Sequence, residues 1–172
     1  MNICVAGWYF EPKIMEALFD SPYSVTIVSH RSRSCFSKYE WPGNQSRITD
    51  VTAPNVGLEW GAYDHYLQTH YVHSDEILDP VLFLHDDAIL PDGFFEQVEE
   101  MGKSWDVAFV FRDKDEAILN GHAHGRCIYM SERILRMFRP MGFWYDETNM
   151  GDVKPPRCNE GIQHFLRDLT WL

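Results

Sequence analysis

Residues 81–87 read Val-Leu-Phe-Leu-His-Asp-Asp, and the fold class follows most directly from this stretch. Four consecutive apolar residues after the Asp79-Pro80 turn are typical of a central strand in a parallel sheet. Ligands of open α/β sheets bind at the carboxyl ends of the strands, which is where Asp86 and Asp87 stand. Carboxylate oxygens at such an edge suit Mg²⁺ or Mn²⁺ that holds a diphosphate. A solvated turn after the strand is the competing interpretation.

On both sides of this strand, the sequence alternates between strand and helix patterns. Apolar and β-branched runs predict strands at 3–7, 24–29, 81–84, 106–111 and 127–130. Helically spaced apolar residues predict helices at 12–20, 56–71, 94–98, 132–138 and 159–169. The stretch 30–54 is rich in Ser, Arg, Pro, Gly and Asn, and it predicts a long loop or insertion with little regular structure. The alternation predicts an α/β fold with a mainly parallel central sheet flanked by helices.

Length and charge limit the class of protein. A chain of 172 residues is about the size of one domain, which we expect to cover residues 1–172. With 15 Lys and Arg against 26 Asp and Glu, the net charge of −11 opposes non-specific attraction to nucleic acid or anionic membranes. No signal-like start and no run of about 18 apolar residues occur, so a cytoplasmic protein without membrane contact is expected. The cysteines form no Cys-x-x-Cys pair and are expected to be reduced thiols: Cys4, Cys35, Cys127 and Cys158.

Two further segments carry residues suited to chemistry. Glu160 and His164 are four positions apart on a predicted helix, and therefore share one face. A carboxylate there would serve as a general base, whereas compensation of the helix dipole is the simpler interpretation. Residues 120–126 place two histidines in a glycine-rich loop that suits a metal or a phosphate, although ordinary loops also contain such pairs. His85 would ligate a metal, bind a phosphate or cap the strand.

Four motifs in order along nearly the whole chain resemble the nucleotide-sugar glycosyltransferases of the GT-A fold, in particular their family 2. Residues 55–63 are similar to the Asn-x-Gly segment that opens a helix in that family. Residues 81–91 are similar to its apolar strand, its acidic motif and the proline that follows. Residues 141–147, Met-Gly-Phe-Trp-Tyr-Asp-Glu, resemble its Gly-x-Phe-Asp-Glu loop beside the acceptor. Residues 159–167 resemble its catalytic Glu-Asp segment. The resemblance implies a compact GT-A-like, Rossmann-like catalytic domain.

The resemblance also implies an activity. A sugar would move from a nucleoside-diphosphate sugar to an acceptor hydroxyl, with inversion of the anomeric centre. Asp87 would hold Mn²⁺ or Mg²⁺, with Asp86 assisting on the metal or the ribose and His164 as a further ligand. Glu160 would be the base that deprotonates the acceptor, with Asp146 as the other catalytic carboxylate. The acceptor would contact Trp144, Tyr145 and His124. The donor would be held by Ala6, Gly7, Trp8, His30, Arg31, Asn55, Gly57 and Asp86.

The chain departs from the family pattern at three places. His85 stands where the first acidic residue of the family's motif usually is. Residues 7–9 and 30–32 lack the Pro-Thr and Asp-Asp patterns that seat the nucleobase. Asn159-Glu160 replaces Glu-Asp and leaves one carboxylate. The nucleobase and the sugar of the donor are therefore left open.

Other functions are compatible with the same residues. A metal-dependent nucleotidyltransferase or phosphohydrolase would use Asp86, Asp87, His122, His124 and His164. A non-catalytic module that binds a nucleotide or a sugar is a third alternative. The acceptor of a transferase would be a small molecule, a protein or a hydroxylated DNA base. DNA as acceptor requires several basic residues to gather on one face against the net charge: Arg31, Arg33, Lys38, Arg47 and Arg126.

Overall fold

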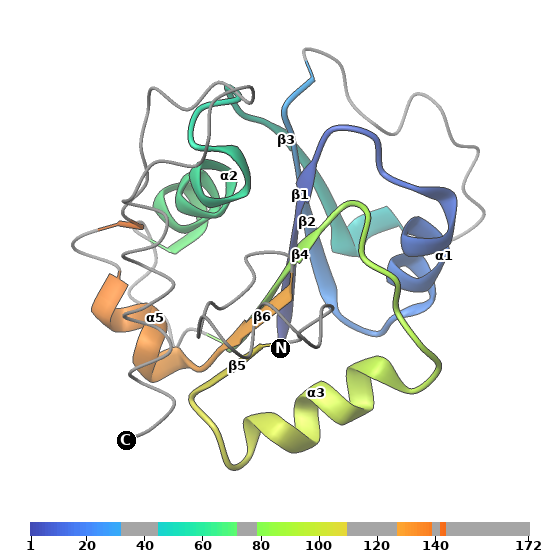
Figure 1. The fold of residues 1–172 in the computed structure, drawn as a ribbon, viewed down its shortest axis with the longest axis vertical. Helices are drawn as coiled ribbons and strands as arrows, with labels where there is room; N and C mark the ends of the chain where they lie inside the picture. The colour runs from blue at the N-terminus through green and yellow to red at the C-terminus, as the bar shows by residue number, and fades with distance from the viewer. Residues whose placement is uncertain (32–44, 72–78, 110–126, 139–141, 144–172) are drawn as a thin grey trace, which may run out of the picture.

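A single six-stranded sheet organises the part of the chain that the computed structural model describes, which is residues 1–31, 45–71, 79–109, 127–138 and 142–143 (Figure 1). The strands lie in the order β3-β2-β1-β4-β6-β5. Their bounds are β1 Asn2–Gly7, β2 Ser24–Ser29, β3 Ile48–Thr52, β4 Val81–His85, β5 Val107–Phe109 and β6 Cys127–Met130. Two strands with long apolar runs, β1 and β4, are neighbours in the middle of the sheet.

The direction of the strands brings several carboxyl ends to one edge of the sheet. β1 pairs in parallel with both β2 and β4, and β2 pairs in parallel with β3. β6 is the reversed strand, because it runs antiparallel to β4 and to β5. The carboxyl ends of β1, β2, β3 and β4 therefore meet at the same edge. The predicted α/β fold with a mainly parallel central sheet is confirmed.

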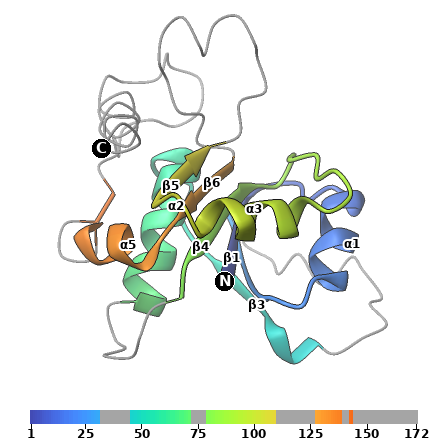
Figure 2. The same ribbon diagram turned by 90° about the horizontal axis from the view of Figure 1, so that it is seen from below.

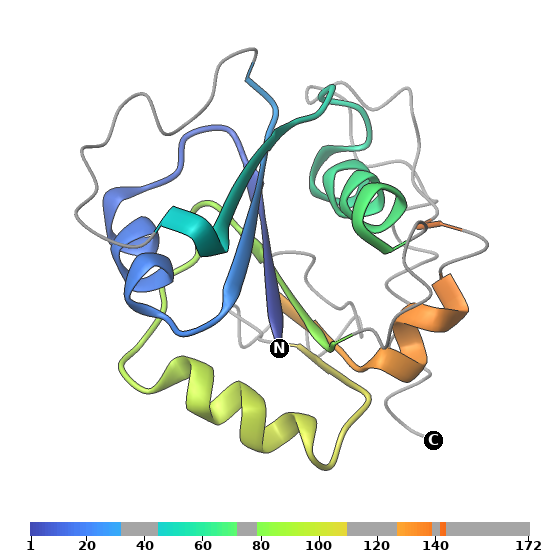
Figure 3. The same cartoon turned by 180° about the vertical axis from the view of Figure 1, so that it is seen from behind.

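Helices cover both faces of the sheet (Figures 2 and 3). α1 (Pro12–Asp20) and α3 (Phe94–Gly102) lie on one face, and α2 (Leu58–Tyr66) and α5 (Glu132–Phe138) lie on the other. A π-helical turn, η3 (Leu67–Tyr71), extends α2, and the short 3₁₀ turn η2 (Gln45–Arg47) precedes β3. α1 begins with a proline, which suits the first helical position because its missing N–H has no helical partner to lose.

Each face of the sheet buries its own apolar cluster. On the α2 face the cluster includes a group of packed aromatic rings, since the Phe83 ring of β4 lies 4.8 Å from Tyr63 and 5.7 Å from Phe143, between ring centroids. On the α1 face the cluster is mainly aliphatic, with Ile14 and Leu18 of α1 against the strands. A central strand that contributes to both clusters must be apolar on both sides, which explains the unbroken run at the start of β4.

One sequence prediction was wrong, and several boundaries moved. The predicted loop at 30–54 contains β3, a strand whose residues are half-buried or exposed and none of which is fully buried. In the described sheet, β3 pairs with β2 alone, so it needs no continuous apolar run, and threonine suits its exposed positions, Thr49 and Thr52. α3 ends at Gly102 rather than at residue 98, and α2 begins at Leu58 rather than at residue 56. The predicted helix at 159–169 lies outside the described residues.

Within the described ranges, none of the helices combines the length and the apolar character that crossing a membrane would require.

Candidate functional site

Four loops meet at the edge of the sheet where the parallel strands end. They are residues 7–10 after β1, 30–31 after β2, 53–57 after β3 and 85–87 at the end of β4. Backbone hydrogen bonds tie these loops together. The N–H of His30 donates to the Gly7 carbonyl oxygen (3.1 Å), and the N–H of Asp86 donates to the Ala6 carbonyl oxygen (2.9 Å). The edge is therefore one connected surface that four loops build.

The edge includes the point where the chain changes its direction of travel across the sheet. From β1 the chain passes through α1 to β2 and then to β3, and it returns through α2 to β4 on the other side of β1. The helices of the two crossovers lie on opposite faces of the sheet. Such a topological switch point leaves a crevice between the carboxyl ends of the two strands, which is where open α/β sheets bind ligands. Here those ends carry residues 7–10 and 85–87.

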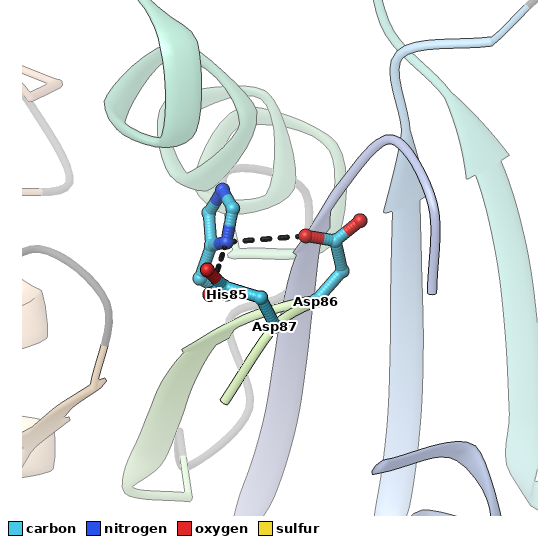
Figure 4. A group of neighbouring side chains, drawn as sticks. All are labelled: His85, Asp86 and Asp87. Carbon is cyan, nitrogen blue, oxygen red and sulfur yellow. Dashed lines mark hydrogen bonds and ion pairs between the residues drawn. The ribbon is translucent and has the colours of Figure 1, made fainter. Parts of the chain in front are cut away.

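His85, Asp86 and Asp87 form a compact group of possible metal ligands at the end of β4 (Figure 4). Their ligand atoms all lie within 4.8 Å of one another. His85 Nδ1 is 2.8 Å from Asp87 Oδ1 and 3.1 Å from Asp86 Oδ1, so the imidazole bridges the two carboxylates. The two aspartates differ in exposure, with 42% of the Asp87 side chain and 4% of the Asp86 side chain accessible.

Asp86 ties the loop after β1 to β4. Its Oδ2 atom accepts hydrogen bonds from three consecutive backbone N–H groups, those of Trp8 (2.7 Å), Tyr9 (2.5 Å) and Phe10 (2.9 Å). The N–H of Glu11 also donates to the backbone carbonyl oxygen of Asp86 (3.3 Å). Successive N–H groups make a concavity that favours an anion, and hydrogen bonds to a charged acceptor are stronger than neutral ones. A buried carboxylate is therefore compensated at this position.

Two backbone features allow this close approach. A Cβ atom on Gly7 would lie 2.1 Å from Asp86 Cγ, so only glycine leaves room for the carboxylate. Phe10 has a φ of +53°, in the left-handed region that residues with a side chain rarely adopt. Its side chain is buried, and that packing together with the hydrogen bond from its N–H to Asp86 holds the conformation. Non-glycine residues in this region persist only where their surroundings over-determine them.

Exposed aromatic rings and basic side chains gather beside this loop. Trp8 and Tyr9 are 40% and 68% exposed, although they follow a strand in the middle of the sheet. The ring centroids of Trp8 and His30 are 6.4 Å apart, and the Arg31 guanidinium lies over the Tyr9 ring at 5.1 Å from its centroid. Flat rings stack on flat ligands, and a guanidinium binds phosphate, so this pair of loops suits a nucleotide.

The loop after β3 closes the same edge. His30 Nδ1 is 3.2 Å from the carbonyl oxygen of Pro54, which links the β2 and β3 loops. Asn55 is half-buried in this loop, and Gly57 has a φ of +73° immediately before α2 begins. A glycine suits that left-handed position because it has no Cβ to clash with the backbone. The Asn-x-Gly segment therefore lies next to the loops that carry Trp8 and Arg31.

The group at the end of β4 fits a hard divalent cation. Mg²⁺ and Mn²⁺ are usually held by one or two carboxylates, with waters and substrate phosphates in the remaining positions. Asp87 offers an accessible carboxylate beside the switch point, and Asp86 Oδ1 and His85 Nδ1 lie within reach of it. The donor set is therefore compatible with a cation that is shared between the protein and a diphosphate.

Part of the predicted site is brought together by the fold. The described residues of that part all belong to the loops at the carboxyl edge: Ala6, Gly7, Trp8, His30, Arg31, Asn55, Gly57, Asp86 and Asp87. The remaining candidates lie outside the described residues: Asp146, Glu160, His164, Trp144, Tyr145, His122 and His124. The convergence of histidines on the metal group and the position of the base are therefore still predictions.

Sequence reasoning missed Tyr9, Phe10 and Asp64. The first two belong to the Asp86 anchor, and the run of three aromatic residues directly after an apolar strand was the signal that could have found them. Asp64 accepts a hydrogen bond from the N–H of Phe143 (2.8 Å). The two residues are 79 positions apart, so no local sequence pattern predicts this contact.

No protein-family model matches this chain, and no curated protein is significantly similar to it.

Proposed function

We propose that the protein is a metal-dependent glycosyltransferase, which moves a sugar from a nucleoside-diphosphate sugar to an acceptor hydroxyl. The observation that supports this proposal best is the set of residues at the carboxyl ends of the two strands of the switch point. An accessible carboxylate, Asp87, ends one of the two strands, and exposed aromatic residues follow the other. A nucleoside-diphosphate sugar needs a carboxylate that binds the metal on its diphosphate, and aromatic rings that stack on its base or sugar, at neighbouring positions.

In this proposal, Asp87 would hold Mn²⁺ or Mg²⁺ together with the diphosphate of the donor. A bound divalent cation neutralises the charge that develops on the leaving diphosphate during transfer. Trp8 and Tyr9 would stack on flat parts of the donor, and Arg31 would contribute positive charge near its phosphates. Asn55 and Gly57 would border the donor from the side of the β3 loop.

The acceptor side of the proposal rests on the resemblance to the GT-A family 2 enzymes. Glu160 would remove the proton of the acceptor hydroxyl, with Asp146 as the second catalytic carboxylate and Trp144 and Tyr145 beside the acceptor. Attack of that oxygen on the anomeric carbon would invert its configuration. A cytoplasmic location completes the proposal, and the buried free thiols of Cys4 and Cys127 are compatible with a reducing compartment.

Thermal unfolding with nucleoside diphosphates and nucleotide sugars, with and without Mn²⁺, tests the proposal. A donor at about 100 times its dissociation constant stabilises the folded state by about 2.7 kcal/mol, which corresponds to a rise in Tm of about 5–10 °C for a chain of this size. We expect such a rise with at least one nucleotide sugar in the presence of Mn²⁺. Asp87→Asn should abolish the part of the rise that requires Mn²⁺.

The matched control is Asp92→Asn, because Asp92 is an exposed aspartate in the loop that follows Asp87. This variant should keep the full Mn²⁺-dependent rise. If no nucleotide stabilises the wild-type protein in a metal-dependent way, the glycosyltransferase proposal is wrong. Release of phosphate or pyrophosphate from a nucleoside triphosphate, which has no glycosyl group on its phosphates, would instead support a phosphohydrolase or a nucleotidyltransferase.

A further inference from the structure

Asp86 and Asp87 are adjacent in sequence and both approach His85 Nδ1, but they differ in burial, and Asp86 also joins the loop after β1. Both oxygens of Asp86 have protein partners, since Oδ2 accepts the N–H groups of Trp8, Tyr9 and Phe10 and Oδ1 lies 3.1 Å from His85 Nδ1. Its side chain is 4% exposed, against 42% for Asp87. A metal that is shared with a soluble diphosphate needs a ligand that the diphosphate can approach.

Metal coordination through Oδ2 of Asp86 would conflict with the loop as it is built. If Oδ2 turned to a cation, the N–H groups of residues 8–10 would lose their common acceptor, and the Phe10 N–H is buried. An unpaired buried N–H is unfavourable, and three neighbouring N–H groups without an anion also repel one another. The left-handed Phe10 would then lose one of the contacts that hold it.

We propose that Asp86 is a positioning residue, which holds the loop that carries Trp8 and Tyr9, and that the carboxylate of Asp87 is the one that binds the metal. The part concerning the metal and the donor rests on the proposed function, whereas the part concerning the loop does not. The two adjacent aspartates thus have different roles, Asp86 as the anchor of the loop and Asp87 as the metal ligand. Gly7 belongs to the anchor, since a Cβ there would overlap the Asp86 carboxylate.

The same substitution at the two neighbouring positions separates these roles. Asp86→Asn keeps a carbonyl oxygen that accepts the three N–H groups, but it removes the negative charge. Asp86→Ala removes the acceptor altogether, and Asp87→Asn removes the proposed ligand and leaves the anchor intact. Rescue by asparagine at position 86 but not at position 87 is the result that positioning predicts.

Amide hydrogen exchange reads out the anchor without any ligand. We expect the amides of residues 8–10 to exchange at similar rates in the wild type and in Asp86→Asn. In Asp86→Ala they should exchange at least about tenfold faster, while the amides of β1 keep their protection. Unchanged exchange of residues 8–10 in Asp86→Ala would overturn the inference.

Calorimetric titration with uridine, adenosine, guanosine and cytidine diphosphates, each with and without Mn²⁺, reads out the division of roles. For the nucleotide that binds, Asp86→Asn should stay within about threefold of the wild type under both conditions. Asp86→Ala should lose about tenfold in affinity whether or not Mn²⁺ is present, and Asp87→Asn should lose only the gain that Mn²⁺ gives.

A loss of the Mn²⁺ gain in Asp86→Asn equal to that in Asp87→Asn would make Asp86 a ligand and overturn the inference. That comparison decides the question even if Asp86→Ala does not fold, because both asparagine variants preserve the shape of the side chain. If no nucleotide binds the wild-type protein, the proposed function fails, while the exchange measurement still decides whether Asp86 anchors the loop.

Discussion

Asp64 shows how one side chain can anchor a distant segment. Its Oδ1 atom accepts the N–H of Phe143, and a Cβ on Gly142 would lie 2.6 Å from that same oxygen. Gly142 has a φ of +66°, so both its conformation and its contact with Asp64 favour glycine. The Phe143 ring packs at 5.5 Å from Trp60 and 4.8 Å from Phe138, between ring centroids. This anchor leads into the segment that we propose for the acceptor.

Asp64 should make stability depend on pH. Burial raises the pKa of its carboxyl above the ordinary value, although the hydrogen bonds from Phe143 N–H and Gln68 partly offset that effect. The folded state thus binds this proton more tightly than the unfolded chain does. The stability contributed by Asp64 is therefore greatest below the ordinary pKa and is lost as pH rises through the raised one.

Asp64→Asn tests this expectation, because asparagine keeps an acceptor for the Phe143 N–H without a charge to bury. In urea denaturation between about pH 4 and pH 7, the free energy of unfolding of the variant should rise relative to the wild type as pH increases, and then level off. Asp64→Ala leaves that N–H unpaired and should lose about 1–3 kcal/mol. A pH-independent difference between the wild type and Asp64→Asn would show that this carboxyl is not perturbed.

At the scale of elements, Ser131 joins the start of α5 to the start of β5. Its hydroxyl donates to Asp106 Oδ1 (2.5 Å) and accepts the N–H of Ile134 (3.5 Å), as an N-cap does. The Arg133 guanidinium pairs with the other oxygen of the Asp106 carboxylate. The hydrogen bonds from Arg133 and from Ser131 hold the pKa of Asp106 below its ordinary value. The stability from this pair is therefore present at neutral pH and is lost as pH falls through the lowered pKa.

Ser131→Ala should lower the free energy of unfolding by about 1 kcal/mol at neutral pH, because it removes the N-cap of α5. It should also move the pKa of Asp106 upward toward its ordinary value. Urea denaturation measures the first effect, and carboxyl chemical shifts across a pH titration measure the second. Ser104→Ala is the control, since Ser104 is exposed in the turn after α3. Equal losses in the two variants would exclude a capping role for Ser131.

At the scale of the whole molecule, Arg31 and Arg47, the two described members of the basic set, lie at opposite ends of the parallel strands. Arg31 follows the carboxyl end of β2, whereas Arg47 precedes β3, at the amino end of that parallel pair. A strand of this length separates the two ends by about 20 Å. Arg47 Nη1 also donates to the carbonyl oxygens of Ser21 (2.5 Å) and Tyr23 (3.4 Å), which ties β3 to the turn before β2. Arg47 therefore has a structural role on the side opposite to the candidate site.

The placement of Arg47 and the net charge of −11 lead us to expect no binding of duplex DNA at physiological salt. Fluorescence anisotropy of a labelled duplex, with the protein at micromolar concentration, measures this directly. The expected result is an unchanged anisotropy in about 0.15 M salt. Tight binding that weakens steeply with added salt would contradict the expectation. A hydroxylated DNA base would then again be a candidate acceptor, together with small molecules and proteins.

Much of the fold follows from local patterns. β2 and α5 have the predicted bounds, and the apolar run of β4 correctly indicates a central strand. β3 was missed because an edge strand of five residues carries no continuous apolar run. The reversed direction of β6 is equally invisible in sequence, since an apolar strand of four residues reads the same whichever way its neighbours run. The single domain over residues 1–172 stays a prediction.

The sequence by itself determined the α/β class and placed two aspartates at the end of a central strand, because hydrophobic periodicity and turn residues act locally. Only the tertiary structure decided what each aspartate does. Asp86 and the loop at 8–10 are almost 80 positions apart along the chain, and three N–H groups meet one carboxylate oxygen only after β1 and β4 have paired. Burial by that pairing makes one of two identical side chains an anchor and leaves the other accessible.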